Sequence, residues 1–297
     1  FVDQDGESTA QSYSGKDLTD KPAIVLMDSG SASASEIFAG GVLGTGSGIV
    51  IGTRSYGKGV AQVLYDESNC PYLHGDAVKV TAYRFYCAGG NTTDRIGVVP
   101  TLYIPQDQAV AAARLLSGEK TKDSAYLRLV LNGCDFYIDI PAAKETSSAA
   151  LEAILAALTP DAVLYWGENG GERKLTLAQA REKCGFAASS ALDFSDVADS
   201  EYAQEIDSLA ASRIVFGDGG KFRPDATMTR AEVCALLAQA LDLYSTANGC
   251  FTDVAKGSWY APSVNAMAAI GLVSGVGGGK FDPNATMTQE EFITVLG

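Results

Sequence analysis

The sequence is poor in histidine, in basic charge and in long apolar runs. Its single histidine, His74, lies in the loop-like stretch Pro71–Gly75, with no serine-elbow motif nearby. A Ser-His-Asp triad would have to use this residue, and a surface or turn histidine is the better interpretation. A nucleophilic serine in this chain must therefore take its base from another residue type.

Basic residues are also scarce. Lys and Arg number 22 against 36 Asp and Glu, which gives a formal net charge of −14 over 297 residues. Such a surface repels phosphate backbones and anionic membranes, and no basic stripe offsets the repulsion. We therefore expect no nucleic-acid partner.

No stretch is apolar enough for a membrane span. The longest uncharged run, Ile37–Thr53, contains six glycines and falls short of the roughly 20 apolar residues that a spanning helix needs. We therefore expect a soluble chain with no transmembrane segment. Phe1 is not a start methionine, so we expect the sequence to begin inside a longer protein, with any signal peptide upstream.

Six cysteines are spread over the chain without C-x-x-C spacing or histidine partners, so we expect no metal site and no cofactor. The even count leaves disulfides open. Pairs Cys134–Cys184 and Cys234–Cys250 would each stay within one predicted domain. The other two cysteines are Cys70 and Cys87.

Residues 1–119 alternate between strand and helix patterns. The apolar run Ala23–Met27 predicts a strand, and Ser33-Ala34-Ser35-Glu36 is a capping box that predicts a helix to about Leu43. The pattern is that of an α/β domain. Further strands are predicted at Gly48–Ile51, Ala61–Tyr65 and Ala77–Tyr86, and a helix at Gln106–Leu116.

Residues 122–190 predict a small α/β spacer domain. Strands at Leu127–Val130 and Phe136–Ile140 flank the hairpin dipeptide Asn132-Gly133. A helix at Ser148–Leu158, a strand at Ala162–Trp166 and a helix at Leu175–Lys183 follow. Nothing in this segment concentrates ionisable groups.

Residues 191–297 contain an internal repeat. Phe194–Val197 matches Phe251–Val254, and Lys221–Pro224 matches Lys280–Pro283. Each unit, 194–245 and 251–297, predicts helix, Gly-rich loop, helix, so we expect an all-α region. The second unit stops inside its last predicted helix, and we expect that it is truncated and that a further repeat is missing.

Ser33 and Lys58, 25 residues apart, are the candidate nucleophile and base. A serine at a helix N-terminus has backbone N–H groups and a positive dipole end beside it, which stabilise an oxyanion. Lys58 must be neutral to accept a proton, which burial away from carboxylates favours. Gln62 can orient a neutral amine. Taken singly, Ser33 is explained as a helix cap and Lys58 as a solvated loop lysine between turn glycines.

Three motifs carry a resemblance to a known family. Gly30–Glu36, Gly57–Gly59 and Gly97–Pro100 are similar to the core pattern of the carboxy-terminal processing, or tail-specific, serine endopeptidases of peptidase family S41. The resemblance covers residues 21–105. It implies a partial crotonase- or ClpP-like α/β core, with Ser33 as the nucleophile and Lys58 as the base of an acyl-enzyme mechanism.

The resemblance also implies the remaining parts of the site. Some members carry an aspartate eleven positions after the serine, where this chain has Gly44; others carry a glutamine four after the lysine, which matches Gln62. The implied oxyanion hole uses the backbone N–H of Ala34 and of a Gly-rich loop upstream of the motif. That loop and the PDZ-like domain of many members lie outside this sequence, so the fragment by itself is expected to lack part of the core.

The terminal repeats resemble S-layer homology repeats. Thr229–Glu232 and Thr288–Glu291 are capping boxes, but Arg230 is not needed for capping. In those repeats, the arginine and a nearby tryptophan contact anionic secondary cell-wall polysaccharide, which implies this role for Arg230 and Trp259. Gln289 keeps the cap in the second repeat and lacks the charge.

The leading hypothesis is an extracellular serine endopeptidase that cleaves protein or peptide substrates near their C-termini and is held at the surface of a Gram-positive bacterium by its repeats. The alternative is a catalytically inactive, wall-bound scaffold or adhesion protein, which Gly44 and Thr53 favour because they depart from the family pattern.

Overall fold

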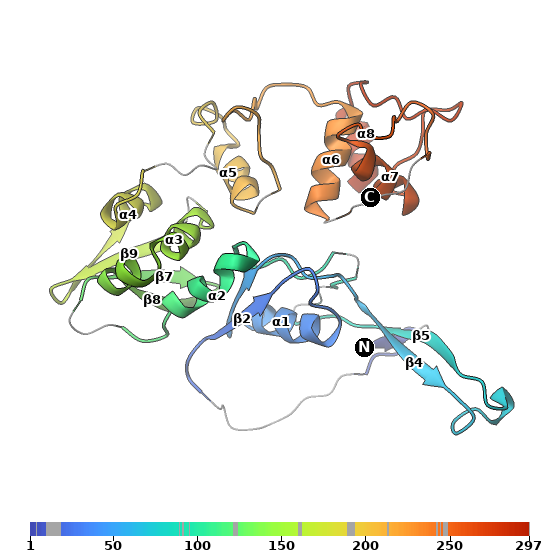
Figure 1. Ribbon diagram of the computed structural model, residues 1–297, viewed down its shortest axis with the longest axis horizontal. Helices are drawn as coiled ribbons and strands as arrows, with labels where there is room; N and C mark the ends of the chain where they lie inside the picture. The colour runs from blue at the N-terminus through green and yellow to red at the C-terminus, as the bar shows by residue number, and fades with distance from the viewer. Residues whose placement is uncertain are drawn as a thin grey trace. The chain divides into compact units, whose positions relative to one another are not determined.

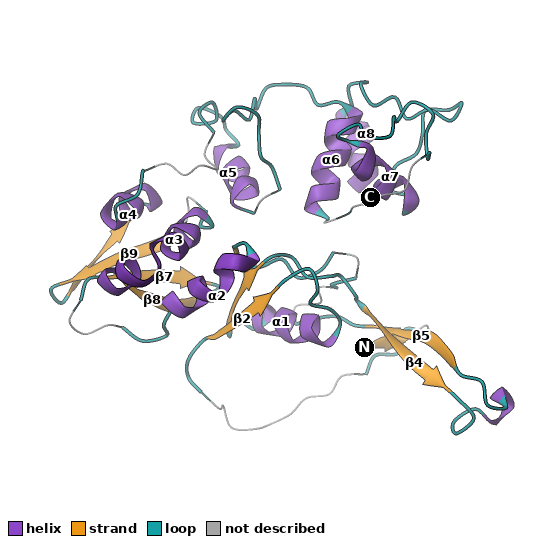
Figure 2. Cartoon of the chain, in the orientation of Figure 1, coloured by secondary structure: helices purple, strands orange, loops and turns teal. Residues whose placement is uncertain are grey.

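The computed structural model describes residues 1–3, 5–9, 19–88, 90, 92–94, 96–120, 124–159, 162–188, 194–212, 214–241, 243, 245 and 249–296. The chain divides into two compact units, Phe1–Ser190 and Ala191–Gly297 (Figure 1). The first unit mixes helices and sheets, and the second is built on helices (Figure 2).

A three-stranded parallel sheet positions the predicted catalytic motif. Its strands are β2 (Ala23–Met27), β3 (Gly48–Gly52) and β6 (Leu102–Tyr103), with β3 in the middle. All of β3 is buried, because Ile49 and Ile51 pack in a core with helix α2 (Gln106–Leu115). Val50 packs with Ala39 of helix α1 (Ala34–Gly44). A central parallel strand covered on both faces is apolar along its whole length.

A second, antiparallel sheet forms a ribbon that extends away from α1 (Figure 1). It consists of β1 (Val2–Asp3), β5 (Val78–Arg84) and β4 (Val60–Tyr65), in that order. A short 3₁₀ turn, η1 (Pro71–Leu73), lies between β4 and β5. Lys58 and Gly59 lead directly into β4, so the predicted base lies at the root of this ribbon.

A four-stranded antiparallel sheet follows. Its order is β10 (Gly171–Leu175), β9 (Val163–Glu168), β7 (Tyr126–Leu131), β8 (Cys134–Asp139), with helices α3 (Ile140–Ala156) and α4 (Leu177–Cys184). The β7–β8 turn is the predicted one, since Asn132 and Gly133 both have positive φ, 49° and 78°.

The sequence predictions for this sheet and its helices are wrong in two places. The helix begins at Ile140 rather than Ser148, because Asp139 caps it: its Oδ1 accepts from Ala142 N at 3.0 Å. The helix is kinked at Ser147, where φ is −161°. Strand β10 was not predicted. Leu175, expected to begin a helix, is instead the last residue of this strand. The sequence Gly-Glu-Arg-Lys is polar throughout, so it lacks the alternation of apolar and polar residues by which a strand is recognised.

Packing in the first unit is continuous across the predicted boundary at 119–122. One core cluster contains Ile49 and Ile51, Ala112 of α2, and Leu129 and Phe136 of the four-stranded sheet. Asn132 Nδ2 also donates to the carbonyl oxygens of Leu43 and Gly48, at 3.0 and 2.8 Å. A separate spacer domain stays a prediction, and these contacts hold the segment against the parallel sheet.

The second unit has helices α5 (Ala203–Ala211), α6 (Arg230–Ala240), α7 (Ala261–Ala269) and α8 (Gln289–Leu296). Isolated β-bridges close its loops, such as Asp218 with Lys221 and Gly277 with Lys280. Across the ranges given above, no helix of the chain combines the length and apolar character needed to cross a membrane. All six cysteines are free thiols, so neither disulfide left open by the sequence is formed.

The two repeats share one loop clamp. The carboxylate of Asp196 accepts from the N–H groups of Phe222 and Arg223, both at 2.9 Å. Asp253 accepts from Phe281 and Asp282, both at 2.8 Å. Arg223 and Asp282 have left-handed backbones, φ 61° and 58°, which the clamp holds in place. These backbone donors lower the pKa of both aspartates.

The clamp predicts acid sensitivity of the second unit. A lowered pKa in the folded state stabilises the fold above the unfolded pKa of about 3.9, and the stabilisation is lost as pH falls through the folded value. Asp253→Asn is expected to lower the melting temperature at pH 7 and to flatten its decline below pH about 4. Trp259 fluorescence in a Trp166→Phe background would follow this unit alone. Asp225→Asn, in the same loop as Arg223, is the control; an equal shift there would contradict the clamp.

Candidate functional site

Ser33 lies at the sharp turn between β2 and α1. Its backbone is left-handed, with φ 57° and ψ −112°, a conformation that is strained for a residue with a side chain. Such strain is held in place by surrounding contacts and is common at active sites. A strained serine between a strand and a helix is also the local arrangement that exposes the nucleophile of many hydrolases.

The contact that holds this turn comes from Glu36, which is fully buried. One carboxylate oxygen, Oε2, accepts from Ser33 N at 2.7 Å and from Lys58 N at 2.8 Å. The other, Oε1, accepts from Gly57 N at 2.7 Å and from Ser55 Oγ at 2.6 Å. Short hydrogen bonds to a buried carboxylate are among the strongest in proteins.

The shared oxygen brings the predicted nucleophile and base together at the level of the backbone. Because both nitrogens bond to Glu36 Oε2, Ser33 N and Lys58 N lie no farther apart than the sum of the two distances, 5.5 Å. A further bond, Tyr56 N to Ser31 O at 2.9 Å, ties the same two loops. Lys58 is half-buried.

The glycines on either side of Lys58 have separate structural reasons. Gly57 has φ 89°, a backbone that favours glycine. Gly59 is packed so closely against the Asp94 backbone that a Cβ would collide with it. Both let the Lys58 loop turn beneath α1.

The other predicted catalytic positions are more dispersed. Gln62 is exposed on β4, and its Nε2 donates to Thr81 Oγ1 at 3.4 Å. Ala34 is the first residue of α1, and its N–H has no hydrogen-bond acceptor among the residues that the structure describes. At Gly44, a Cβ would lie 2.8 Å from the carbonyl carbon of Ala88, so this position has no room for an aspartate.

The sequence analysis missed Ser55 and gave Glu36 only a capping role. Ser55 is 2% exposed; its Oγ donates to Glu36 and accepts from Val98 N at 2.6 Å. It therefore links α1 to the third motif, Gly97–Pro100. The signal available in the sequence was an acid inside the nucleophile motif and a serine two residues before the base motif.

Cys87 lies beneath α1 but is not an alternative nucleophile. The Cys87 Sγ lies 3.8 Å from the backbone oxygen of Glu36. The side chain is packed so closely against α1 that a Cβ added to Gly40 would lie 2.9 Å from the Cβ of Cys87. Burial raises the pKa of the Cys87 thiol, and the Glu36 charge adds to the effect. A thiol kept protonated is a poor nucleophile.

In the second unit, the two predicted wall-binding residues occupy different environments. Arg230 donates from Nε to Phe281 O at 3.0 Å and from Nη2 to Ser274 O at 3.1 Å. Its guanidinium lies 4.8 Å from the Phe281 ring centroid, so it joins the two repeats. Trp259 is 65% exposed.

Trp259 lines a groove of about 420 Å³ together with the first repeat's loop and α6. The groove contains the exposed Phe216 and Met228, the cations Lys221 and Arg223, and the acids Asp218 and Glu232; Arg223 is ion-paired with Asp218. Arg230 is not among its lining residues. An open groove with aromatic walls suits a sugar polymer, while its two cations are balanced by two carboxylates.

Comparison with known proteins agrees with both parts of the chain. The sequence model of peptidase family S41 matches residues 1–104, and that of the S-layer homology domain matches residues 193–234 and 251–293. The chain thus carries an S41 peptidase segment followed by two S-layer homology domains.

The curated relatives divide in the same way. A carboxy-terminal-processing protease of Bartonella bacilliformis is 40% identical over 30% of this chain and 20% of its own length. The carboxy-terminal processing protease CtpB of Bacillus subtilis is 34% identical over 39% of this chain and 24% of its own. A surface-layer 125 kDa protein of Lysinibacillus sphaericus is 33% identical over 35% and 9%. The chain therefore spans a quarter or less of each of these relatives.

The Glu36 contacts predict that replacing one oxygen of this carboxylate strongly lowers the stability of the fold. Glu36→Gln replaces a carboxylate oxygen by an NH₂ group that faces a backbone donor, which is expected to cost about 3 kcal/mol of unfolding free energy. Urea denaturation of the chain measures it. Glu145→Gln, an exposed acid on α3, is the matched control and is expected to change little. A Glu36→Gln protein as stable as the control would show that the carboxylate does not hold the turn.

Proposed function

We propose that the protein containing this chain is a serine endopeptidase that hydrolyses peptide bonds near protein C-termini, with Ser33 as nucleophile and Lys58 as general base. The observation that carries the proposal is the Glu36 carboxylate, which binds the backbones of both residues through one oxygen. The match to peptidase family S41 over the same residues supports it.

The proposed reaction follows from these positions. In the neutral form that the role of base requires, Lys58 takes the proton of the Ser33 hydroxyl as Oγ attacks the substrate carbonyl carbon. The negative oxygen that forms is stabilised by the N–H of Ala34, whose donor is free of described partners, and by the α1 dipole. The protonated lysine then gives its proton to the leaving amine, and water hydrolyses the acyl-enzyme by the same route. Gln62 would orient the amine, which requires its side chain to leave Thr81.

The alternative is a catalytically inactive scaffold or adhesion protein. The bond from Gln62 to Thr81 favours it, because that side chain is engaged on the ribbon. The glycine at position 44 does not favour this alternative. The Ala88 backbone leaves no room there for an aspartate, which is compatible with a site whose third residue is a glutamine.

The second unit supports a location at a bacterial cell surface. The two S-layer homology domains, and a relative named as a surface-layer protein, point to attachment to cell-wall polysaccharide. In our proposal Trp259 stacks on sugar rings in its groove. Arg230 acts by joining the repeats, because its donors are bonded to Phe281 and Ser274.

Substitutions at the Ser-Lys pair test the catalytic proposal in protein expressed from the complete reading frame. Ser33→Ala is expected to lower peptidase activity roughly 10⁶-fold, because no nucleophile remains. Lys58→Arg is expected to do the same, because a guanidinium stays charged and cannot accept a proton. Cleavage of an unfolded protein with a fluorescent tail measures both. Ser35→Ala, in the same motif and exposed, is the control; full activity in Ser33→Ala would end the assignment.

A second prediction separates wall binding from folding. Trp259→Ala is expected to weaken co-sedimentation with purified cell walls about tenfold without changing the melting temperature, since the side chain is exposed. Arg230→Ala is expected to lower both. Tyr72→Ala, an exposed aromatic of the first unit, is the control. Wall binding by Trp259→Ala at the wild-type level would remove the groove from the proposal.

A further inference from the structure

Strand β4 has a free edge that begins two residues after the predicted base, Lys58. In the order β1, β5, β4, strand β4 pairs only with β5 among the described strands, so no strand lies along its other edge. The residues of β4 are Val-Ala-Gln-Val-Leu-Tyr, with no charge among them. The backbone N–H and C=O groups of such an edge can pair with another extended chain.

The hydrogen bonds on the β5 side show which residues face the free edge. Phe85 N donates to Gly59 O at 3.0 Å, so the backbone groups of Gly59 face β5. Along an antiparallel pair, residues that bond to the partner strand alternate with residues whose backbone groups face away from it. The N–H and C=O groups of Val60 and Gln62 therefore face the free edge.

Two contacts mark the ends of this edge and agree with the alternation. At the start, Lys58 N donates to Glu36 Oε2 at 2.8 Å, away from β5. At the far end, Leu64 O accepts from Asn69 Nδ2 at 3.0 Å. The backbone groups of the two outward-facing residues in between, 60 and 62, have no hydrogen-bond partner in the described part of the chain. The free edge is thus short, and Asn69 closes its far end.

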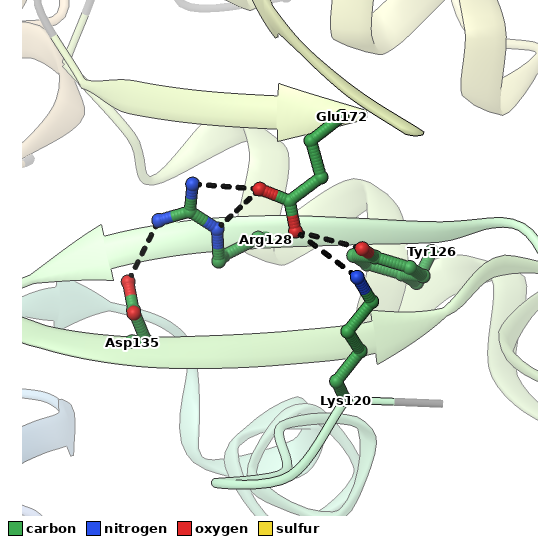
Figure 3. Close-up of polar contacts among 5 residues, drawn as sticks. All are labelled: Lys120, Tyr126, Arg128, Asp135 and Glu172. Atoms are coloured by element: carbon green, nitrogen blue, oxygen red, sulfur yellow. Dashed lines mark hydrogen bonds and ion pairs between the residues drawn. The ribbon is translucent and has the colours of Figure 1, made fainter. Parts of the chain in front are cut away.

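Strand β10, at the edge of the four-stranded sheet, shows the charged character that usually protects an edge. Its sequence is Gly-Glu-Arg-Lys-Leu. Glu172 accepts from Arg128 at 2.8 Å and from Tyr126 Oη at 2.7 Å (Figure 3). Lys120 lies 3.8 Å from the same carboxylate. A strand that approached β10 would have to desolvate these charges, whereas β4 presents no charged side chain to an approaching strand.

The free edge of β4 continues directly from the predicted catalytic pair. Ser33 N and Lys58 N are held by the same oxygen of Glu36. Val60 follows Lys58 by two residues, which is about 7 Å in a strand that rises roughly 3.3 Å per residue. A chain paired with this edge therefore passes within a few residues of Ser33.

We propose that the edge of β4 at Val60 and Gln62 binds the polypeptide substrate as an added, extended strand. This inference rests on the proposed peptidase function and specifies how the same site takes its substrate. Hydrogen bonds from a strand edge recognise the peptide backbone, which every protein segment has, and so they demand little of the sequence. The bound segment must be extended and free of hydrogen bonds of its own. The substrate class is therefore unfolded segments rather than folded domains.

A second copy of this chain suits the edge less well than a substrate. Stable dimers bury roughly 1,200–2,000 Å² in total, far more than an edge with two outward-facing residues provides. Two copies would also repel one another, because each carries a net charge of −14. A substrate that binds transiently needs only a few backbone hydrogen bonds.

Proline substitutions test the edge in protein expressed from the complete reading frame. Proline removes one N–H and is tolerated at an edge position whose N–H faces outward. Val60→Pro is expected to weaken binding of the unfolded protein with a fluorescent tail about tenfold, because a substrate carbonyl loses its donor. Leu64→Pro removes an outward N–H at the end closed by Asn69 and is the matched control, with an expected change of less than twofold. Fluorescence anisotropy in a Ser33→Ala background measures binding, and equal affinities of the two proline variants overturn the proposal.

A second measurement leaves the protein unchanged and does not depend on the folding of Val60→Pro. In a short peptide from the same unfolded protein, each backbone N–H is replaced in turn by an ester oxygen. Binding is expected to weaken at every second position, because only alternate N–H groups of a paired strand face the edge. A profile without this alternation overturns the proposal.

The outcomes separate this inference from the peptidase proposal. Cleavage by Ser33→Ala would end the catalytic assignment, while alternation along the ester peptides would still support binding at the edge. Inactive Ser33→Ala together with unchanged binding by Val60→Pro would leave the peptidase and overturn the edge. Two further results would also overturn it: a dimer in sedimentation that Val60→Pro makes monomeric, and amides of Val60 and Gln62 protected from hydrogen exchange in the complete protein without peptide.

Discussion

The first unit depends on one buried carboxylate. Glu36 lies on the first turn of α1, and its four hydrogen bonds reach Ser33 on its own turn and Ser55, Gly57 and Lys58 on the loop after β3. No donor among these is a cation, so the charge is stabilised by N–H and O–H dipoles alone. Such a site is rigid, because loss of any one donor leaves part of a buried charge without compensation. The strained backbone of Ser33 can persist because this carboxylate fixes it.

Carboxylates that accept hydrogen bonds from backbone N–H groups also occur in the second unit, where they close loops. Asp196 and Asp253 each accept from two consecutive backbone N–H groups and close a loop around a left-handed residue. In a chain rich in acids and poor in bases, carboxylates that bond to the backbone need no cation. The acidity of the sequence is therefore compatible with a well-determined fold, and it leaves few cations for internal ion pairs.

The sequence was sufficient for the elements whose patterns are local. The strand Ala23–Met27, the helix after Ser33 and the Asn132-Gly133 hairpin all follow from short-range rules and are confirmed. The capping box at Ser33–Glu36 is also confirmed in its acidic half, through the bond from Ser33 N to Glu36. What could not be predicted is that the same glutamate bonds to Gly57 and Lys58, because that contact joins residues more than twenty positions apart and depends on how β3 brings the second loop under α1. Strand β10 failed for another reason: it is a polar edge strand whose apolar residue comes only at its end.

Arginine in this chain illustrates why residue type alone does not define a site. Arg230 belongs to a motif that the sequence links to polymer binding, yet its donors reach Phe281 and Ser274 and it packs on an aromatic ring. Arg128, by the same standard, is occupied by Glu172 and Asp135. A guanidinium whose donors are already bonded must break those bonds before it can hold a ligand, and the ligand must compensate for the loss.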